Sequence, residues 1–168
     1  MENNYKEGLK NISTFIFDVD GVLTDGSLLI DSEGNMLRKM NVKDGYALKI
    51  AIESGYNICI ISGGNNESVR KRLKGLGIKE IHLGSENKTE QLNSFIKKYD
   101  LDKKNILFMG DDIPDIPVLK IIGLPCCPQD ATPEVKNFCS YVSHKNGGRG
   151  AVRDVIEQVM KIQNKWAK

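Results

Sequence analysis

Long apolar runs and an excess of one charge are both missing from this sequence. No stretch comes near the roughly 20 apolar residues that a membrane-spanning helix needs, and the polar segment 1–10 lacks the apolar stretch of a signal peptide. The 24 basic and 22 acidic side chains are interspersed and give a formal net charge of only +2. Neither nucleic acid nor a membrane is therefore expected as a partner.

Cysteine is scarce, and its spacing matches neither a redox pair nor a zinc site. The four cysteines are Cys59, Cys126, Cys127 and Cys139. Three of them lie in apolar runs or in stretches of helical period, where a free thiol behaves as a small hydrophobe. Free thiols are typical of a reducing compartment, so we expect a cytoplasmic protein.

What the sequence does contain is a regular alternation of short apolar runs with stretches of helical period. Strands are predicted at 12–17, 57–61, 80–83, 105–109 and 124–127. Helices are predicted near 44–55 (with Asp44 as its N-cap), 67–74, 89–99, 118–122 and 151–163. The alternation is typical of an α/β fold with a doubly wound parallel (Rossmann-like) sheet, and 1–168 suits a single domain. Two short runs around a turn-rich pentapeptide predict a small β-hairpin extension at about 27–40.

Three of the predicted strands lead directly into polar residues. The segments are Asp18-Val19-Asp20-Gly21, Ser62-Gly63-Gly64 and Gly110-Asp111-Asp112. Ligand sites of open parallel sheets lie outside the carboxyl ends of the strands, so these segments are expected to meet at one edge. Any single Asp there has an alternative role as a solvated turn residue. Two pairs of carboxylates in one small space repel each other unless a cation lies between them, and all-oxygen ligands favour Mg²⁺.

Carboxylates beside Mg²⁺ point to phosphoryl chemistry. A carboxylate can attack phosphorus and form an aspartyl-phosphate, and the phosphoryl oxygens then need positive charge around them. Lys88, just ahead of a predicted helix, is a candidate for part of that charge, with a solvated surface lysine as the alternative. Ser62 and the amides of Gly63 and Gly64 form a turn suited to phosphate oxygens.

In their order along the chain, these residues resemble the four motifs of the haloacid dehalogenase superfamily of phosphatases. The resemblance rests on Asp18-Val19-Asp20-Gly21, Ser62, Lys88 and Gly110-Asp111-Asp112 with Asp115, and it spans nearly the whole chain. It implies that Asp18 is the nucleophile. It also implies that Asp20 protonates the leaving oxygen and then activates the water that hydrolyses the aspartyl-phosphate.

The resemblance also implies a set of binding residues. Ser62 and Lys88 would hold the transferring phosphoryl group, with Gly63 counted among the substrate-binding residues. Asp18, the backbone carbonyl of Asp20, and Asp111 would bind Mg²⁺. Asp112 would support Lys88 or a metal-bound water.

Three narrower motifs resemble the 3-deoxy-D-manno-octulosonate 8-phosphate phosphatases of lipopolysaccharide synthesis. They are DVDGVLTD at 18–25, NVKDGY at 41–46 and GGRGAV at 147–152. Related enzymes that act on nonulosonate (sialic-acid-like) 9-phosphates share the same small frame and are the alternative. They tend to carry charged residues at the positions of Gly64 and Gly75, which favours the eight-carbon substrate here. Many octulosonate enzymes have Thr in place of Ser62 and Arg near position 64 or 65, so the contacts to the rest of the substrate stay open.

No interval of the chain is long enough for a cap domain. Only the hairpin and one helix fit between Asp20 and Ser62, and only a helix and a strand fit between Lys88 and Asp111. Since closing such a site strengthens its electrostatics, we expect a neighbouring subunit to cover it. The apolar hairpin would be a liability on a monomer, and the resemblance implies a homotetramer built through it. The alternative is a hairpin folded back onto its own core.

Arg72 and Arg149 are the candidates for binding the substrate carboxylate, because a guanidinium matches a carboxylate in a planar, bidentate way. Arg149 lies in a glycine-rich segment that is expected to be flexible. Each arginine acts either in its own subunit or, by the resemblance, in a neighbouring one; surface arginines are the alternative. His82 and His144 have no visible partners in the sequence and are assigned no role.

Two alternatives come from other functional classes. A phospho-accepting receiver domain also combines clustered acids, a hydroxyl residue and a lysine on a doubly wound sheet. It has no need for a second carboxylate two residues after the phosphorylated one, as Asp20 follows Asp18 here. The other alternative, an inactive relative acting as a regulatory subunit, disagrees with the intact set of acids.

Overall fold

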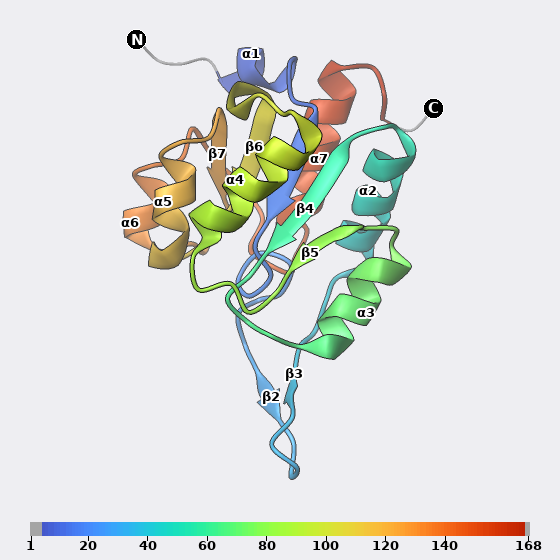
Figure 1. Ribbon diagram of the computed structural model, residues 1–168, viewed down its shortest axis with the longest axis vertical. Coiled ribbons are helices and arrows are strands. Elements are labelled where there is room, and N and C mark those ends of the chain that lie inside the picture. Colours follow the sequence, from blue (N-terminus) through green and yellow to red (C-terminus); the bar gives the residue numbers. More distant parts are fainter. Residues whose placement is uncertain (1–4, 167–168) are drawn as a thin grey trace.

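A six-stranded, all-parallel sheet runs through the centre of the computed structural model, which describes residues 5–166 (Figure 1). Its strand order is β5-β4-β1-β6-β7-β8. The strands are β1 (Thr14–Phe17), β4 (Asn57–Ile61), β5 (Glu80–His82), β6 (Ile106–Met109), β7 (Leu124–Cys127) and β8 (Tyr141–Val142). Thr14 pairs in parallel register with both Asn57 and Ile106. The predicted doubly wound α/β sheet is confirmed, with β8 as an additional short edge strand.

Helices cover both faces of the sheet because alternate strand residues point to opposite sides. Phe15 and Phe17 of β1 belong to one apolar cluster and Ile16 to the other. The first cluster packs against α1 (Tyr5–Leu9), α2 (Val42–Glu53), α3 (Glu67–Gly75) and α7 (Ala151–Ile162). The second packs against α4 (Lys88–Tyr99), α5 (Ile116–Leu119) and α6 (Pro133–Lys136). No helix within residues 5–166 is long and apolar enough to cross a membrane.

The path of the chain through the sheet brings the polar segments together. From β1 in the middle the chain moves outward to β4 and β5, then returns to β6 on the other side of β1. The loops that follow β1, β4 and β6 therefore leave the same edge side by side. Backbone bonds continue the pairing past the strand ends, from the Asp18 amide to the Met109 carbonyl (3.1 Å) and from the Ser62 amide to the His82 carbonyl (2.9 Å).

The predicted hairpin is present and projects from the end of the molecule where β4 terminates (Figure 1). Its strands are β2 (Leu29–Ile30) and β3 (Met36–Leu37), paired antiparallel. Asp31 closes the turn by accepting hydrogen bonds from the Glu33 and Asn35 amides. The apolar side chains of both strands are exposed, with Leu29 and Ile30 at 69% and 65%. The alternative in which the hairpin folds back onto its own core is therefore wrong.

The start of α2 differs from the prediction. Asn41, rather than Asp44, is the N-cap, and its side chain accepts the Lys43 amide at 2.8 Å. Asp44 lies in the first turn and is 1% exposed. Its carboxylate accepts the amides of Gly150 and Arg153 at the start of α7, at 3.3 and 2.8 Å. The same residue thus caps a helix that begins more than 100 positions later, because α2 and α7 pack side by side.

Candidate active site

A cavity of about 310 Å³ opens where the loops after β1, β4 and β6 meet. The candidates from all three loops line it, together with Lys88 at the start of α4. Its lining residues are Asp18, Asp20, Gly26, Ser62, Gly63, Gly64, Lys88, Asp111, Asp112, Pro114 and Asp115. The polar segments that the sequence expects at one sheet edge therefore share one space.

Three carboxylates and one ammonium form the floor of this cavity. Asp18, Asp111 and Asp115 each offer a carboxylate oxygen, and these oxygens lie within 4.8 Å of one another. The Lys88 Nζ lies 2.8 Å from Asp18 Oδ2 and 2.7 Å from Asp115 Oδ1. Lys88, Asp18 and Asp115 are all buried. Ion pairs this deeply buried are seldom kept for stability alone, because desolvation offsets much of their attraction.

The cluster holds more negative charge than Lys88 can balance. Burial, followed by the charge of Asp115, raises the pKa of Asp18 to about 6, although Lys88 opposes the shift. Burial, followed by the charge of Asp18, raises the pKa of Asp111 to about 8. Carboxylates that resist ionisation in this way become favourable ligands once a cation joins them. An all-oxygen donor set of this size fits Mg²⁺.

The structure shows why the first acidic pair is followed by a glycine, Gly21. Its φ of +85° lies in the left-handed region that other residues rarely adopt. A side chain at this position would also overlap the Asp111 carboxylate. The glycine therefore lets the loop after β1 turn directly against the acid that arrives from β6.

The loop after β4 brings a hydroxyl to the cavity. Ser62 is 2% exposed, and its Oγ accepts the Gly64 amide at 3.3 Å. The chain then runs to Asn66, whose side chain accepts the Val69 amide and caps α3. Ser62 and the following glycines are thus held in an ordered turn in front of a helix, which suits them to phosphate oxygens.

The partner of Lys88 differs from the one expected. Asp112 caps the short 3₁₀ helix Ile113–Asp115 by accepting the Ile113 amide at 2.7 Å, and it is exposed. Asp115, one helical turn beyond Asp111, binds Lys88 instead and also accepts the Asp111 amide at 2.9 Å. The expectation that Asp112 supports Lys88 is wrong, because the turn directs Asp115 inward. The four-residue spacing between Asp111 and Asp115 was the feature of the sequence that could have indicated this contact.

Asp20 lies at the rim, outside the three-carboxylate cluster. Both of its carboxylate oxygens accept hydrogen bonds from Arg38, at 2.8 and 3.0 Å. Arg38 follows β3 of the hairpin, and sequence reasoning assigned it no role. The path of a hairpin cannot be deduced from local pattern, so the contact becomes visible only in the folded chain.

The two candidate arginines lie outside this cavity. Arg149 is exposed, and its guanidinium lies 3.3 Å from Asp25. Its segment was expected to be flexible, but it is closely packed, since a side chain at Gly147 would overlap the Gly21 carbonyl. The Arg72 guanidinium lies against α2, 2.7 Å from where a Cβ on Gly45 would be. Neither arginine lines the cavity of its own subunit.

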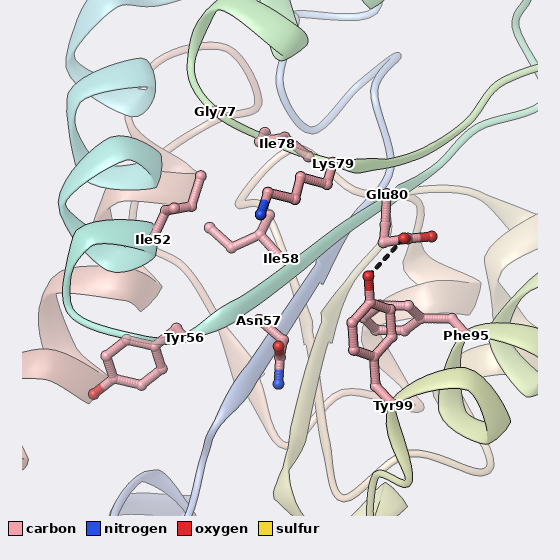
Figure 2. Close-up of a pocket in the computed structure, with 10 residues that line it drawn as sticks. All are labelled: Ile52, Tyr56, Asn57, Ile58, Gly77, Ile78, Lys79, Glu80, Phe95 and Tyr99. Atoms are coloured by element: carbon pink, nitrogen blue, oxygen red, sulfur yellow. Dashed lines mark hydrogen bonds between the residues drawn. The ribbon is translucent and has the colours of Figure 1, made fainter.

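The two histidines lie near acids outside the cavity. His82 Nε2 is 3.5 Å from a Glu80 oxygen and His144 Nδ1 is 3.6 Å from an Asp154 oxygen. A second hollow, of about 200 Å³, lies at the opposite, amino-terminal ends of β4 and β5. The Tyr99 hydroxyl donates a hydrogen bond to Glu80 there, at 2.7 Å. Figure 2 shows this pair of side chains. None of the candidate site residues lines this hollow.

Comparisons with known proteins agree with this geometry. The sequence profile of the haloacid dehalogenase-like hydrolases matches residues 80–156. The 3-deoxy-D-manno-octulosonate 8-phosphate phosphatase of Salmonella typhi is 36% identical over 156 residues, which cover 93% of this chain and 83% of that protein. The chain belongs to the haloacid dehalogenase superfamily. It is accordingly an enzyme of the phosphatase class. The alternative of a phospho-accepting receiver domain is therefore wrong.

Solved structures of this superfamily match nearly the whole fold. The octulosonate 8-phosphate phosphatase of Yersinia pestis superposes with a TM-score of 0.94 at 31% identity, covering 97% of this chain and 88% of that one. The enzyme of Moraxella catarrhalis, solved with a magnesium ion, a phosphate ion and a KDO molecule, gives 0.93 at 33% identity and covers 96% and 92%. Within residues 5–166, this member of the superfamily has no cap domain, because the chain between β1 and β4 forms only the hairpin and α2.

Proposed function

We propose that the protein hydrolyses 3-deoxy-D-manno-octulosonate 8-phosphate through an aspartyl-phosphate on Asp18, with Mg²⁺ as cofactor, in lipopolysaccharide precursor synthesis. The observation that carries this proposal is Lys88, buried between Asp18 and Asp115 in the cavity that Asp111 and Ser62 also line. Relatives that match most of the chain are named for their action on the eight-carbon sugar-acid phosphate, which supports this substrate. The magnesium, phosphate and KDO of the Moraxella catarrhalis enzyme support both the cofactor and the substrate.

In the first half-reaction Asp18 is the nucleophile. One of its carboxylate oxygens attacks the phosphorus, and the bond from phosphorus to the sugar oxygen breaks. Asp20 gives its proton to that sugar oxygen, which leaves as a hydroxyl. Lys88, Ser62 and the amide of Gly63 hold the phosphoryl oxygens and stabilise the negative charge that gathers on them.

In the second half-reaction the aspartyl-phosphate is hydrolysed. A water molecule attacks the phosphorus and gives a proton to the Asp20 carboxylate. The bond from phosphorus to the Asp18 oxygen breaks, so that inorganic phosphate leaves and the Asp18 carboxylate is restored. Asp20 is then protonated and ready to act as the acid in the next cycle.

The metal is held by oxygen ligands around the nucleophile. In this proposal the carboxylates of Asp18 and Asp111 and the main-chain carbonyl of Asp20 would hold the ion, and Asp112 would lie close to it. When bound, Mg²⁺ supplies positive charge that neutralises the phosphoryl oxygens. The raised pKa values of Asp18 and Asp111 support a cation between them.

The experiment that tests the function is phosphate release by the purified protein from two substrates, octulosonate 8-phosphate and a nonulosonate 9-phosphate. We expect release that requires Mg²⁺, stops with chelator and is clearly faster with the eight-carbon substrate. A preference for the nine-carbon substrate would overturn the substrate assignment alone. Release that persists in chelator would overturn the metal-dependent mechanism.

We further propose that residues 1–168 form one catalytic domain, that the protein acts in the cytoplasm, and that it assembles as a homotetramer through the hairpin. The exposed apolar side chains of β2 and β3 support the assembly, and four free cysteines support a reducing compartment. In such an assembly Arg72 and Arg149 bind the substrate carboxylate at the cavity of a neighbouring subunit.

Arg149→Ala tests that last assignment. We expect KM for the sugar-acid phosphate to rise about tenfold, the size of one lost charge-assisted contact. KM for p-nitrophenyl phosphate, which has no carboxylate, should stay unchanged. Steady-state kinetics on both substrates checks this. Equal KM changes for the two substrates would contradict carboxylate binding by Arg149.

A further inference from the structure

Arg38 extends from the end of the hairpin to the rim of the active site and donates hydrogen bonds to both carboxylate oxygens of Asp20. Its Nε lies 2.8 Å from Oδ1 and its Nη2 lies 3.0 Å from Oδ2. The Arg38 side chain is 8% exposed, whereas that of Asp20 is 34% exposed. A guanidinium buried against the more open carboxylate of a bidentate pair fixes the direction of that carboxylate.

Arg38 is itself anchored by a backbone carbonyl that a second side chain also binds. Its Nη1 donates to the Met36 carbonyl at 2.8 Å, and Asn66, the N-cap of α3, donates to the same carbonyl at 3.1 Å. The end of the hairpin is therefore tied to the loop that follows β4. The hydrogen bond to Asp20 raises the pKa of Arg38 above its ordinary value, so the guanidinium keeps its charge.

Gly64 provides the space that this pair occupies. A Cβ at position 64 would lie 2.9 Å from Asp20 Oδ2 and 3.3 Å from Arg38 Nη2. Both distances are shorter than ordinary contacts, so a side chain there would have to displace the carboxylate or the guanidinium. The contact between Arg38 and Asp20 therefore depends on the absence of a side chain at position 64.

The geometry points to a role in one half of the reaction. Because both of its oxygens accept N–H groups of Arg38, the carboxylate form of Asp20 is held in one orientation. That is the form needed when water attacks the aspartyl-phosphate, its proton passes to Asp20, and the bond from phosphorus to Asp18 breaks. We propose that Arg38 is a positioning residue that orients Asp20 as the general base for hydrolysis of the aspartyl-phosphate. This inference rests on the proposed function.

The test replaces Arg38 by methionine and uses p-nitrophenyl phosphate with Mg²⁺. Its leaving group needs little protonation, so the first half-reaction proceeds without help from Asp20. In Arg38→Met we expect kcat to fall about a hundredfold, the lower end of general acid–base effects. The fraction of subunits carrying phosphate on Asp18 at steady state, read by acid quench and intact mass, should rise to a majority.

Three further variants make the result specific. Lys39→Met removes the neighbouring, exposed charge of the same hairpin and should leave both kcat and the phosphorylated fraction as in the wild type. Arg38→Lys keeps the charge but not the fork of donors, so it should give intermediate values. Gly64→Ala keeps Arg38 yet crowds its contact with Asp20, and it should also accumulate phosphorylated subunits.

The outcomes separate this inference from the function on which it rests. A wild type that releases no phosphate from octulosonate 8-phosphate with Mg²⁺ overturns the proposed function. An active wild type with an Arg38→Met variant whose kcat stays within about twofold overturns the positioning role alone. The same holds if kcat falls without a rise in phosphorylated subunits, since a merely structural role would lower activity in that way.

Discussion

Asp18 and Asp115 flank the same buried ammonium, yet their surroundings differ. Asp18 is 7% exposed, whereas Asp115 is 1% exposed and lies in the turn that follows β6. Asp115 accepts the amides of Asp111 and Asp112 in addition to Lys88. Two carboxylates at similar distances from one lysine are therefore suited to different roles: Asp18 is the proposed nucleophile, and Asp115 holds the loop.

We predict that Asp18→Asn abolishes turnover and leaves the fold intact. An amide keeps the shape of the side chain but cannot attack phosphorus. It also removes one negative charge from a crowded cluster, which offsets the weaker contact with Lys88. Phosphate release should fall to background while the melting temperature stays within a few degrees of the wild type. Substantial retained turnover would falsify the nucleophile assignment.

Asp115→Asn is expected to lower stability as well as activity. Hydrogen bonds to charged groups are worth roughly 1.5–3 kcal/mol, and this carboxylate makes three of them. We expect the free energy of unfolding in urea to fall by about 2 kcal/mol. In the matched control, Asp112→Asn, the residue at the cap of the 3₁₀ helix remains a good capping residue, so its unfolding energy should change by less than about 0.5 kcal/mol.

At the scale of elements, Asp44 connects two helices that are far apart in sequence. It lies in α2, and its carboxylate accepts hydrogen bonds from amides at the start of α7 that would otherwise be unpaired. Burial raises the pKa of Asp44, and the bonds from Arg153 and Gly150 only partly oppose this. The site therefore favours an acceptor that carries no charge.

We predict that Asp44→Ala destabilises the fold by about 1–3 kcal/mol, because two amides of α7 lose their acceptor inside the protein. Asp44→Asn keeps one acceptor oxygen without the buried charge, so it should cost less than half as much. Urea unfolding followed by circular dichroism measures both. Equal losses for the two variants would show that the charge, rather than the acceptor, is what α7 requires.

The sequence predicts the elements and most of the cavity lining because those depend on local pattern. A strand that ends in acids or in Ser62 places them at a known edge, and Lys88 precedes an amphipathic helix. The remaining parts depend on contacts between distant segments. Arg38 lies on a hairpin whose direction no periodicity encodes, and Asp44 and Asn41 are equally good caps until α7 packs beside α2. The short strand β8 is only two residues long and has no pattern to detect.

On the scale of the whole molecule, the hairpin is an element whose apolar side chains face water. Its exposed apolar side chains are Leu28, Leu29, Ile30, Met36 and Leu37. They are contiguous on an element that projects from the domain (Figure 1). Burial of such a patch between subunits stabilises an assembly by about 25 cal/mol per Å² of apolar area, less the cost of association.

We predict that Ile30→Glu converts the proposed tetramer into smaller species without unfolding the chain, since Ile30 is 65% exposed within it. Light scattering at micromolar concentration should give four times the subunit mass of 18.7 kDa for the wild type and a lower mass for the variant. Asn35→Glu, a charge added in the turn of the same hairpin, is the control and should leave the mass unchanged. A wild type of monomeric mass would contradict the assembly.

The central position of β1 determines when the site is completed during folding. Its Thr14 pairs with Asn57 on one side and with Ile106 on the other. Such non-local pairings form slowly, because long loops must close before any contact rewards them. A nascent chain that ends before β6 holds Asp18 on a strand with one side unpaired, and it has neither Asp111 nor Asp115. Catalytic competence is therefore acquired only after β6 has been made and has docked onto β1, the strand that carries Asp18.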